Sequence, residues 1–280
     1  MEALVNYFSN MPTTHRTAFL VGGLATFWMI ESAVPLFKFE YNKWRHALLN
    51  LFFVATTAII NLGLAFLLVM AADWVVAEKI GLLQIVEMPL WLQVVAGLLL
   101  MDLIGAWLVH WVEHKVTWMW RFHMVHHSDH NVDTTTANRH HPGESVFRFV
   151  FTTIAVIVIG APMWLVILYQ TMSVILTQFN HANLNMPAWL DNALVWVLVT
   201  PNMHRVHHHY RLPYTDTNYG NIFSVWDRLF GTFAVADNSK LKYGIDTYME
   251  KEASDHLWTI LKLPFMKYRK TIEYQEEEKF

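Results

Sequence analysis

The stretch from Ala47 to Ala72 decides the class of fold, because it runs for 26 residues without a charged side chain. About 20 apolar residues suffice to cross the hydrocarbon core of a bilayer as a helix. Within lipid, a helix satisfies all of its own backbone hydrogen bonds, which an open extended segment cannot do. The sequence therefore predicts an integral membrane protein built from helices.

Three further apolar stretches follow the same pattern: Ala18–Phe37, Met88 to about Trp111, and Phe147–Phe179. The last is 33 residues long and is divided by Gly160-Ala161-Pro162. Proline ends or kinks a helix, and histidines on both sides of this stretch must share one side of the membrane if they share a metal site. We therefore expect a bent hairpin, and about four membrane-embedded helices in an all-α integral membrane fold.

The loops between these stretches predict the orientation. The first loop is basic through Lys38, Lys43 and Arg45, the second is net acidic, and the segment after the third stretch is basic again. Lys and Arg are enriched in cytoplasmic loops, so we expect a cytosolic cap in a bacterial inner membrane or the endoplasmic reticulum. The start of the chain lacks the pattern of a cleaved signal peptide.

No linker divides the chain, so residues 1–280 are expected to form a single membrane domain. Residues 188–199 read as an amphipathic segment at the membrane interface. Residues 240–280 read as a charged cytosolic tail ending in Glu276-Glu277-Glu278. The net charge of −3 offers no basic face, so no nucleic-acid partner is expected. With no cysteine, neither disulfides nor thiolate metal sites are available.

Histidine is unusually frequent, with 16 residues, and half of them form three clusters. The clusters are His110-x3-His114, His123-x2-His126-His127 and His204-x2-His207-His208. Residues three and four apart share a face of a helix, so we expect the rings of each cluster to converge on one point. Eight imidazoles exceed the ligands of one metal ion, which favours two ions. His15, His46 and His256 stand alone and read as ordinary surface or core residues.

Imidazole alone does not select the metal, because it suits iron, zinc, copper and nickel. The sequence contains neither the His-Glu-x-x-His of zinc proteases nor the Glu-x-x-His of soluble di-iron bundles. Ring N–H groups of metal-bound histidines need carboxylate or carbonyl partners. Candidates for that role are Glu113, Asp129, Asp133, Glu144, Asp216 and Asp227.

The histidine clusters and their surroundings resemble the fatty acid hydroxylase / sterol desaturase superfamily over about residues 102–233. The matching segments are Asp102-Leu-Ile-Gly-Ala-Trp-Leu-Val-His-Trp-Val-Glu-His114, Trp120-Arg-Phe-His-Met-Val-His-His-Ser128, Arg139-His-His-Pro142, His181-Ala-Asn-Leu184, Thr200-Pro-Asn-Met-His-Arg-Val-His-His208, Asp216-Thr-Asn-Tyr-Gly220 and Trp226-Asp-Arg-Leu-Phe-Gly-Thr232.

This resemblance implies a cytosolic cap that holds two iron ions, uses dioxygen, and receives two electrons from a separate donor, cytochrome-b-type or ferredoxin-type with an NAD(P)H reductase. It implies metal ligation by the eight clustered histidines and, in addition, by His141 and His181. His130, His140 and His209 read as neighbours of the site. The metal ligands implied are His110, His114, His123, His126, His127, His141, His181, His204, His207 and His208.

The implied reaction is hydroxylation of an unactivated C–H bond of a lipid, with desaturation by the same site as an alternative. We expect the lipid to enter sideways past Trp107, Trp111 and Trp118. Asp102 within the third apolar stretch reads either as a functional residue or as one that reaches the interface. A metal transporter or metal-binding protein is a different reading, but the histidines lie on one side rather than along a path. A zinc hydrolase would act without dioxygen.

Overall fold

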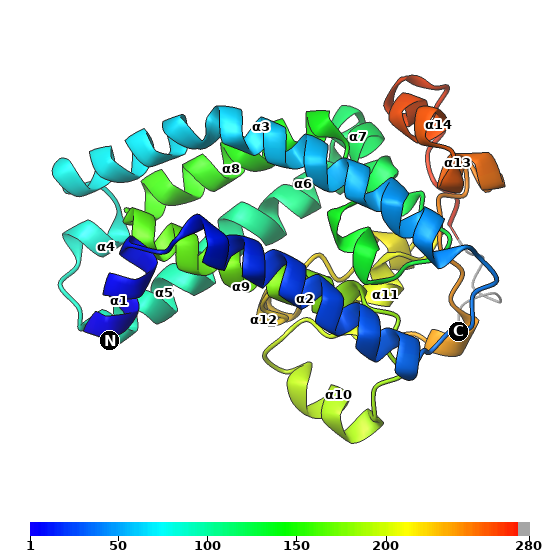
Figure 1. Ribbon diagram of the computed structural model, residues 1–280, viewed down its shortest axis with the longest axis horizontal. Coiled ribbons are helices and arrows are strands. Elements are labelled where there is room, and N and C mark those ends of the chain that lie inside the picture. The colour runs from blue at the N-terminus through cyan, green and yellow to red at the C-terminus, as the bar shows by residue number, and fades with distance from the viewer. Residues whose placement is uncertain (274–280) are drawn as a thin grey trace.

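The computed structural model describes residues 1–273, so the predicted run Glu276-Glu277-Glu278 lies outside the described residues. Within them the fold is helical, and the only β-type pairing consists of isolated bridges. Long helices lie lengthwise beside one another, and shorter segments gather at the right-hand end of the view in Figure 1. The predicted all-α class is confirmed.

The long helices form the body of the molecule, in which α3 lies against α8 and α2 against α9. A π-helical segment, η1, joins α5 to α6 and makes them one continuous rod. The wider turns of a π-helix occur frequently at functional sites. The bounds are α2 Thr13–Ala33, α3 Lys43–Ala77, α5 Leu90–Asp102, η1 Leu103–Leu108, α6 Val109–Lys115, α8 Pro142–Ile159 and α9 Met163–His181.

The predicted hairpin is present, because α8 ends at Ile159 and α9 begins at Met163. Gly160 closes α8 with φ +73° and ψ +39°, a left-handed conformation that suits glycine. A Cβ atom on Gly81 would lie 2.2 Å from the Gly160 backbone nitrogen, so this turn and the α3–α4 turn touch through their backbones. The hairpin returns the chain to the end at which α8 began.

Three helical stretches among the described residues are long and apolar enough to cross a membrane: Lys43–Ile85, Leu90–Lys115 and Pro142–Ile159. Their outer faces carry exposed apolar side chains, such as Leu62 at 80% exposure on α3. α2 and α9 overlap other predicted stretches but are not among the three. Both are more polar: α2 carries Glu31, and α9 carries Gln170, Ser173 and Gln178.

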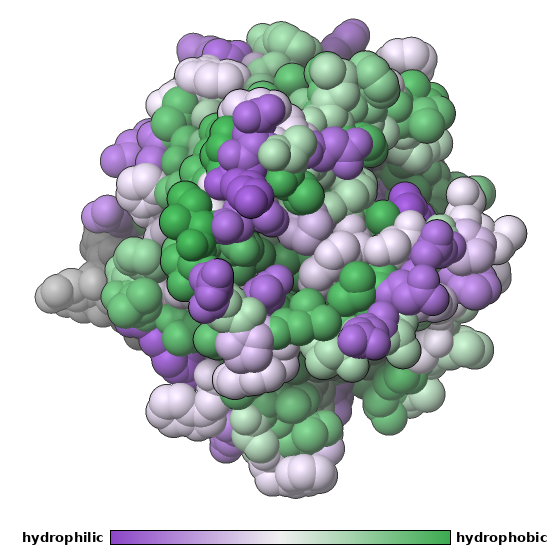
Figure 2. Space-filling view, turned by 90° about the vertical axis from the view of Figure 1, so that its left-hand side faces the viewer, coloured by the Kyte–Doolittle hydropathy of each residue, from purple (hydrophilic) through white to green (hydrophobic). Residues whose placement is uncertain are grey.

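The shorter helices lie at the two ends of the body. At the end seen in Figure 2, hydrophilic patches alternate with hydrophobic ones. The end of α3 and the α3–α5 connection expose Asp73, Glu78 and Lys79 as well as apolar Leu82 and Ile85, as expected of a boundary between lipid and water. The remaining helices are α1 Glu2–Ser9, α4 Leu82–Ile85, α7 Thr117–His127, α10 Ala188–Leu194, α11 Pro201–His207, α12 Val225–Leu229, α13 Lys251–Asp255 and α14 Leu257–Lys262.

Among the described residues, four short 3₁₀ turns lie between the helices: η2 Thr134–Asn138, η3 Tyr214–Asp216, η4 Asn238–Lys240 and η5 Leu263–Phe265. α10 occupies the first half of the predicted interfacial segment. Trp189 at its start and Trp196 just beyond it are both largely exposed.

Candidate metal centre

The two histidine clusters with the same spacing lie on two short helices, α7 and α11, with His208 just beyond the end of α11; the start of α11 is fixed by local sequence. Pro201 occupies the first turn of α11, where its missing N–H costs nothing. The Thr200 hydroxyl accepts a hydrogen bond from the Met203 backbone N–H at 3.3 Å and caps the helix. This cap sets the angular position of His204, His207 and His208.

The clustered histidines form two groups. Within each group, the ligand nitrogens all lie within 4.8 Å of one another. His181, at the end of α9, lies in the second group. The first group is His110, His114, His123, His127 and His207, and the second is His126, His181, His204 and His208.

The expectation that each sequence cluster converges on one point holds for His110 and His114, which both join the first group, and is wrong for the other two clusters. On α7, His123 and His127 join the first group, and His126 joins the second. On α11, His204 and His208 join the second group, and His207 joins the first. Each helix therefore gives two ligands, one turn apart, to one group and its intervening ligand to the other. Both helices carry the His-x-Val-His-His pattern. Each of them therefore contributes histidines to both groups, in opposite proportions.

The spacing of the ring nitrogens suits a shared cation. The Nε2 atom of His181 lies 3.0 Å from that of His126, 3.0 Å from that of His204 and 3.2 Å from that of His208. Two imidazoles bound at right angles at about 2.1 Å to one metal place their nitrogens about 3.0 Å apart. In the first group, the Nε2 atoms of His110 and His123 lie 3.1 Å apart.

In three of these histidines, the opposite ring nitrogen has a partner that fixes the tautomer. His110 Nδ1 faces the Tyr219 carbonyl at 2.8 Å, His207 Nδ1 the Thr217 carbonyl at 2.7 Å, and His181 Nδ1 the Thr177 carbonyl at 2.8 Å. A carbonyl only accepts, so each Nδ1 carries the hydrogen and each Nε2 keeps its lone pair. Several inward lone pairs without a donor between them are the arrangement that a bound metal ion satisfies.

Burial keeps the rings neutral. It lowers the pKa of His204 and His208 well below the usual value, and that of His207 to about 4. The Nε2 atoms of His127 and His207 are buried and have no hydrogen-bond partner among the described residues. A neutral imidazole with a free Nε2 lone pair can bind a metal ion. The residues present therefore fit a pair of metal ions.

Glu144 is the carboxylate closest to the site. Its Oε1 accepts from His123 Nδ1 at 2.8 Å, His140 Nδ1 at 2.9 Å and Arg148 Nε at 2.9 Å. Glu113 is bound by Arg148 at 2.6 Å and lies 3.6 Å from His123 Nδ1, and Asp216 lies 3.7 Å from His114 Nδ1. Glu144 and Glu113 thus lie near the Nδ1 atom of His123, and Asp216 lies near that of His114.

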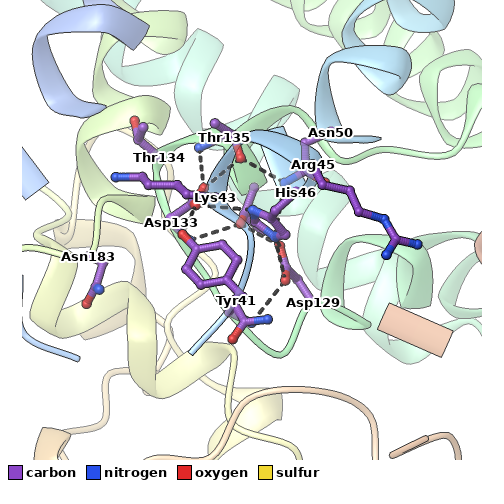
Figure 3. A network of polar contacts seen from close by, with 12 residues as sticks. Tyr41, Lys43, Arg45, His46, Asn50, Asp129, Asp133, Thr134, Thr135 and Asn183 are labelled. Atoms are coloured by element: carbon purple, nitrogen blue, oxygen red, sulfur yellow. Dashed lines mark hydrogen bonds and ion pairs between the residues drawn. The ribbon is translucent and has the colours of Figure 1, made fainter. Parts of the chain in front are cut away.

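Asp129 and Asp133 serve a different network, in which they face His46 from two sides (Figure 3). His46 is thus a core residue rather than a surface residue, which are the two possibilities that the sequence left open. Asp227 contacts no histidine of the two groups. Its carboxylate accepts from the backbone N–H groups of Tyr219 and Gly220, both at 2.8 Å, and thereby positions the carbonyl that faces His110.

Asp102 is fully buried, so it does not reach toward the membrane interface. Its carboxylate accepts from the backbone N–H of Ile222 at 3.1 Å, the backbone N–H of Phe223 at 3.0 Å and Trp226 Nε1 at 3.2 Å. Asp102 and Asp227 together hold the loop between α11 and α12 against the α5–α6 rod.

The structure does not bring His141 into either group. Its ring caps α8, where Nδ1 accepts from the Gly143 N–H at 3.0 Å, and packs on Phe122. Its neighbour His140 lies closer, stacked on His126 with ring centroids 4.5 Å apart and grouped with His123 and Glu144. His130 and His209 lie outside both groups. The spacing of four residues between His140 and Glu144 is the one feature of the sequence that could have indicated the contact between their side chains.

One cavity reaches both groups of histidines. Its wall includes His110 from the first group and His126, His181 and His204 from the second. The three tryptophans expected along the lipid path do not line it. Trp107 is buried and donates from Nε1 to Asp227 at 3.0 Å, whereas Trp118 is exposed beside Phe147.

Comparison with known proteins gives a consistent result. Residues 94–232 match the model of the family described as fatty acid hydroxylase. An ornithine lipid hydroxylase of Rhizobium tropici is 30% identical over 147 residues, covering 52% of this chain and 43% of that protein. An alkylglycerol monooxygenase of Xenopus tropicalis is 35% identical over 149 residues, covering 50% of this chain and 30% of that protein.

A cholesterol 25-hydroxylase-like protein of Danio rerio is 29% identical over 171 residues, covering 58% of this chain and 59% of that protein. The chain thus matches less than half the length of the first two relatives. No solved structure matches it. The matched region runs from α5 to the loop after α12 and includes every histidine of the two groups.

Proposed function

Because this chain belongs to the fatty acid hydroxylase and sterol desaturase superfamily through residues 94–232, we propose that it is a di-iron membrane oxygenase that hydroxylates an unactivated C–H bond of a lipid. One observation carries this proposal: nine histidines form two adjacent groups, and one cavity between the long helices reaches both. Relatives named as lipid hydroxylases and monooxygenases support the same reaction class.

Each group would hold one iron ion, with five imidazoles in the first and four in the second. Imidazole also binds zinc, copper and nickel, so the choice of iron rests on the chemistry. An alkyl C–H bond has no acidic proton, and bound iron supplies the one-electron oxidation and the use of dioxygen that breaking it requires.

The protein's own contribution is position and exclusion of water. The carbonyls of Tyr219, Thr217 and Thr177 hold the ring hydrogens on Nδ1, which keeps each Nε2 lone pair aimed inward. The cavity wall holds the lipid against both groups. The overall balance is R–H + O₂ + 2e⁻ + 2H⁺ → R–OH + H₂O.

The reaction as written consumes two electrons, and the chain has no cysteine that could supply them by thiol redox chemistry. We propose a cytochrome-b-type or ferredoxin-type donor with an NAD(P)H reductase. Since such donors are soluble or anchored at the cytoplasmic face, the proposal also requires the histidine cap to face the cytoplasm. The basic first loop with Lys38, Lys43 and Arg45 supports that orientation.

Isotope labelling tests the reaction. Membranes that contain the chain, supplied with reductant and ¹⁸O₂, are expected to convert a lipid into a product that carries a single ¹⁸O atom. Membranes without the chain, and the same membranes under argon, serve as controls. Mass spectrometry of the extracted lipids gives the measurement.

Each other outcome contradicts the proposal in its own way. A product that has lost two hydrogens without gaining oxygen identifies a desaturase. Product formation under argon identifies a hydrolase. Metal uptake into sealed vesicles without any lipid product identifies a transporter.

A further inference from the structure

The segment formed by α14 and η5 carries large apolar side chains on two opposite faces. Ile260 is fully buried, in a cluster with Phe53 of α3 and Trp120 of α7. On the other face, Trp258 is 66% exposed and Phe265 is 70% exposed. A helix on the surface of a water-soluble domain is apolar on one face only. Packing within the described residues therefore accounts for the inner face of this segment but not for the outer one.

The exposed residues of the outer face form a single stripe, which consists of Trp258, Lys262 and Phe265. They are spaced four and three residues apart, and side chains at these spacings share one face of a helix. Lys262 is exposed between the two aromatic residues. Aromatic rings that alternate with a lysine are typical of a helix that lies at the surface of a bilayer.

The charge around this outer stripe is positive, although the chain as a whole has a net charge of −3. Residues 256–272 contain four cations and no carboxylate. One of them, Arg269, is paired with Asp246 at 2.8 Å. The other three are exposed and form no ion pair with another described residue: Lys262, Lys267 and Lys270. These lysines leave a positive charge that an anionic surface would neutralise.

The outer stripe is continuous with the part of α8 that faces lipid. The ring centroids of Phe265 and Phe122 lie 5.8 Å apart, and those of Phe122 and Phe147 lie 5.4 Å apart. Phe147 belongs to the second turn of α8, one of the three candidate spans, where Val150 is exposed. Exposed Trp118 packs edge-on against the same Phe147 at 5.0 Å. Phe265 therefore lies at the level at which α8 enters the membrane.

We propose that the outer stripe of α14 and η5 rests on the membrane surface, with its aromatic rings at the boundary between headgroups and acyl chains and its lysines against anionic phospholipid headgroups. Tryptophan is enriched at this boundary. Each lysine close to an anionic surface strengthens attachment about fivefold. An acidic soluble protein would match the lysines, but it would not explain the continuity with the lipid face of α8. The proposal does not depend on the reaction, and the segment lies outside the matched residues 94–232.

This contact would set the depth of the metal centre. η5 packs against α7, and Arg121 of α7 donates to the Met266 carbonyl at 2.8 Å. The same helix carries His123, His126 and His127, which belong to the two metal groups. A segment held at the headgroups therefore holds α7 and its histidines close to them. Part of the expected charged tail is thus assigned to the membrane surface rather than to the cytosol.

Spin labels test the contact directly, because the chain has no cysteine and a single introduced one reports on one position. Trp258→Cys and Phe265→Cys are labelled with a nitroxide in the full-length protein, reconstituted into vesicles of phosphatidylcholine and phosphatidylglycerol. Electron paramagnetic resonance compares collisions of the label with oxygen, which enters bilayers, and with a water-soluble nickel chelate. Both labels are expected to show a several-fold higher ratio of oxygen to nickel collisions than the control Glu252→Cys, an exposed carboxylate position on α13.

The lysines are tested by changing the lipid. Without phosphatidylglycerol, the ratio at Phe265→Cys is expected to fall, and combined replacement of the three lysines by Gln is expected to remove this dependence on lipid. Ratios at both labels equal to that of the Glu252→Cys control would overturn the proposal. A ratio that does not depend on phosphatidylglycerol would overturn the role of the lysines. Labels that contact water in vesicles, and lose that contact only when a soluble ferredoxin is added, would overturn the membrane contact in favour of a protein partner.

Discussion

His208→Ala is expected to reduce the metal content from two ions per chain to about one and to abolish lipid oxidation. His208 lies with His126, His181 and His204 in the group of four. Removal of a hydrogen-bonding residue that merely supports a metal ligand already costs 10- to 100-fold in affinity. Loss of one of only four ligands is expected to cost more than about 100-fold. Elemental analysis of the purified protein and product assays measure both effects.

His209→Ala is the matched control, because His209 is the next residue along the chain and is equally buried but lies outside both groups. Its Nδ1 accepts from the Lys242 backbone N–H at 3.2 Å, and its ring packs on Tyr210 and Tyr214. It is expected to retain two ions. If His208→Ala also retains two ions and full turnover, the assignment of the second group is wrong. If both variants lose metal equally, disruption of the fold accounts for the loss.

Asp129→Ala is expected to destabilise the protein by about 3–5 kcal/mol, because it removes the carboxylate that pairs with two buried cations, His46 and Arg139. The Asp129 carboxylate bonds His46 Nε2 at 2.9 Å and the Thr136 hydroxyl at 2.7 Å, with Arg139 at 3.9 Å. Burial alone would raise the pKa of Asp129, but His46 and Arg139 hold it well below its usual range. The carboxylate is therefore ionised, and these side chains are all buried.

Figure 3 shows the network that Asp129→Ala would disrupt. The network joins the start of α3, where Asp133 accepts from Tyr41 at 2.6 Å, to the loop between α7 and α8. That loop follows His126 and His127 and leads to His140 and Glu144. Loss of the network frees the segment that sets the end of α7.

Thermal unfolding in detergent measures this prediction. For a domain of this size, 1 kcal/mol corresponds to about 2–4 °C, so Asp129→Ala should lower Tm by roughly 10 °C. Asp73→Ala is the control, because Asp73 is an exposed carboxylate on α3 and should change stability by less than about 0.5 kcal/mol. A Tm shift for Asp129→Ala no larger than that of the control would contradict the role of the network.

The membrane character and the hairpin could be read from the sequence because both depend on local signals. A run of 26 uncharged residues predicts a span whatever surrounds it. Gly160 and Pro162 likewise end α8 and start α9 through their own backbone conformations. The number of spans was harder to predict, because Gln170 and Ser173 make α9 polar on the side that faces the cavity.

The identity of the histidines was also local, but their division between two groups was not. Spacing of three and four places His123, His126 and His127 on one stripe of a helix. Only the facing helix α11 determines that His126 turns to the second group. The division of the histidines between the two groups thus depends on the angle between α7 and α11. The sequence of either helix alone does not predict that angle.

His141 illustrates a limit of a different kind. His140 and His141 are adjacent, and both precede Pro142, so sequence offers little to separate them. The helix start decides the matter: His141 becomes the N-cap of α8, and its Nδ1 accepts from Gly143. His46 was likewise unpredictable as an ion-pair centre, because its partners Asp129 and Asp133 lie more than 80 residues away in the chain.

Diffraction from metal-loaded crystals, recorded on both sides of the iron absorption edge, tests the central claim most directly. The account predicts two anomalous peaks per chain, one among His110, His114, His123, His127 and His207 and the other among His126, His181, His204 and His208. A single peak shared by all nine rings, or ions bound elsewhere with both groups empty, would contradict it.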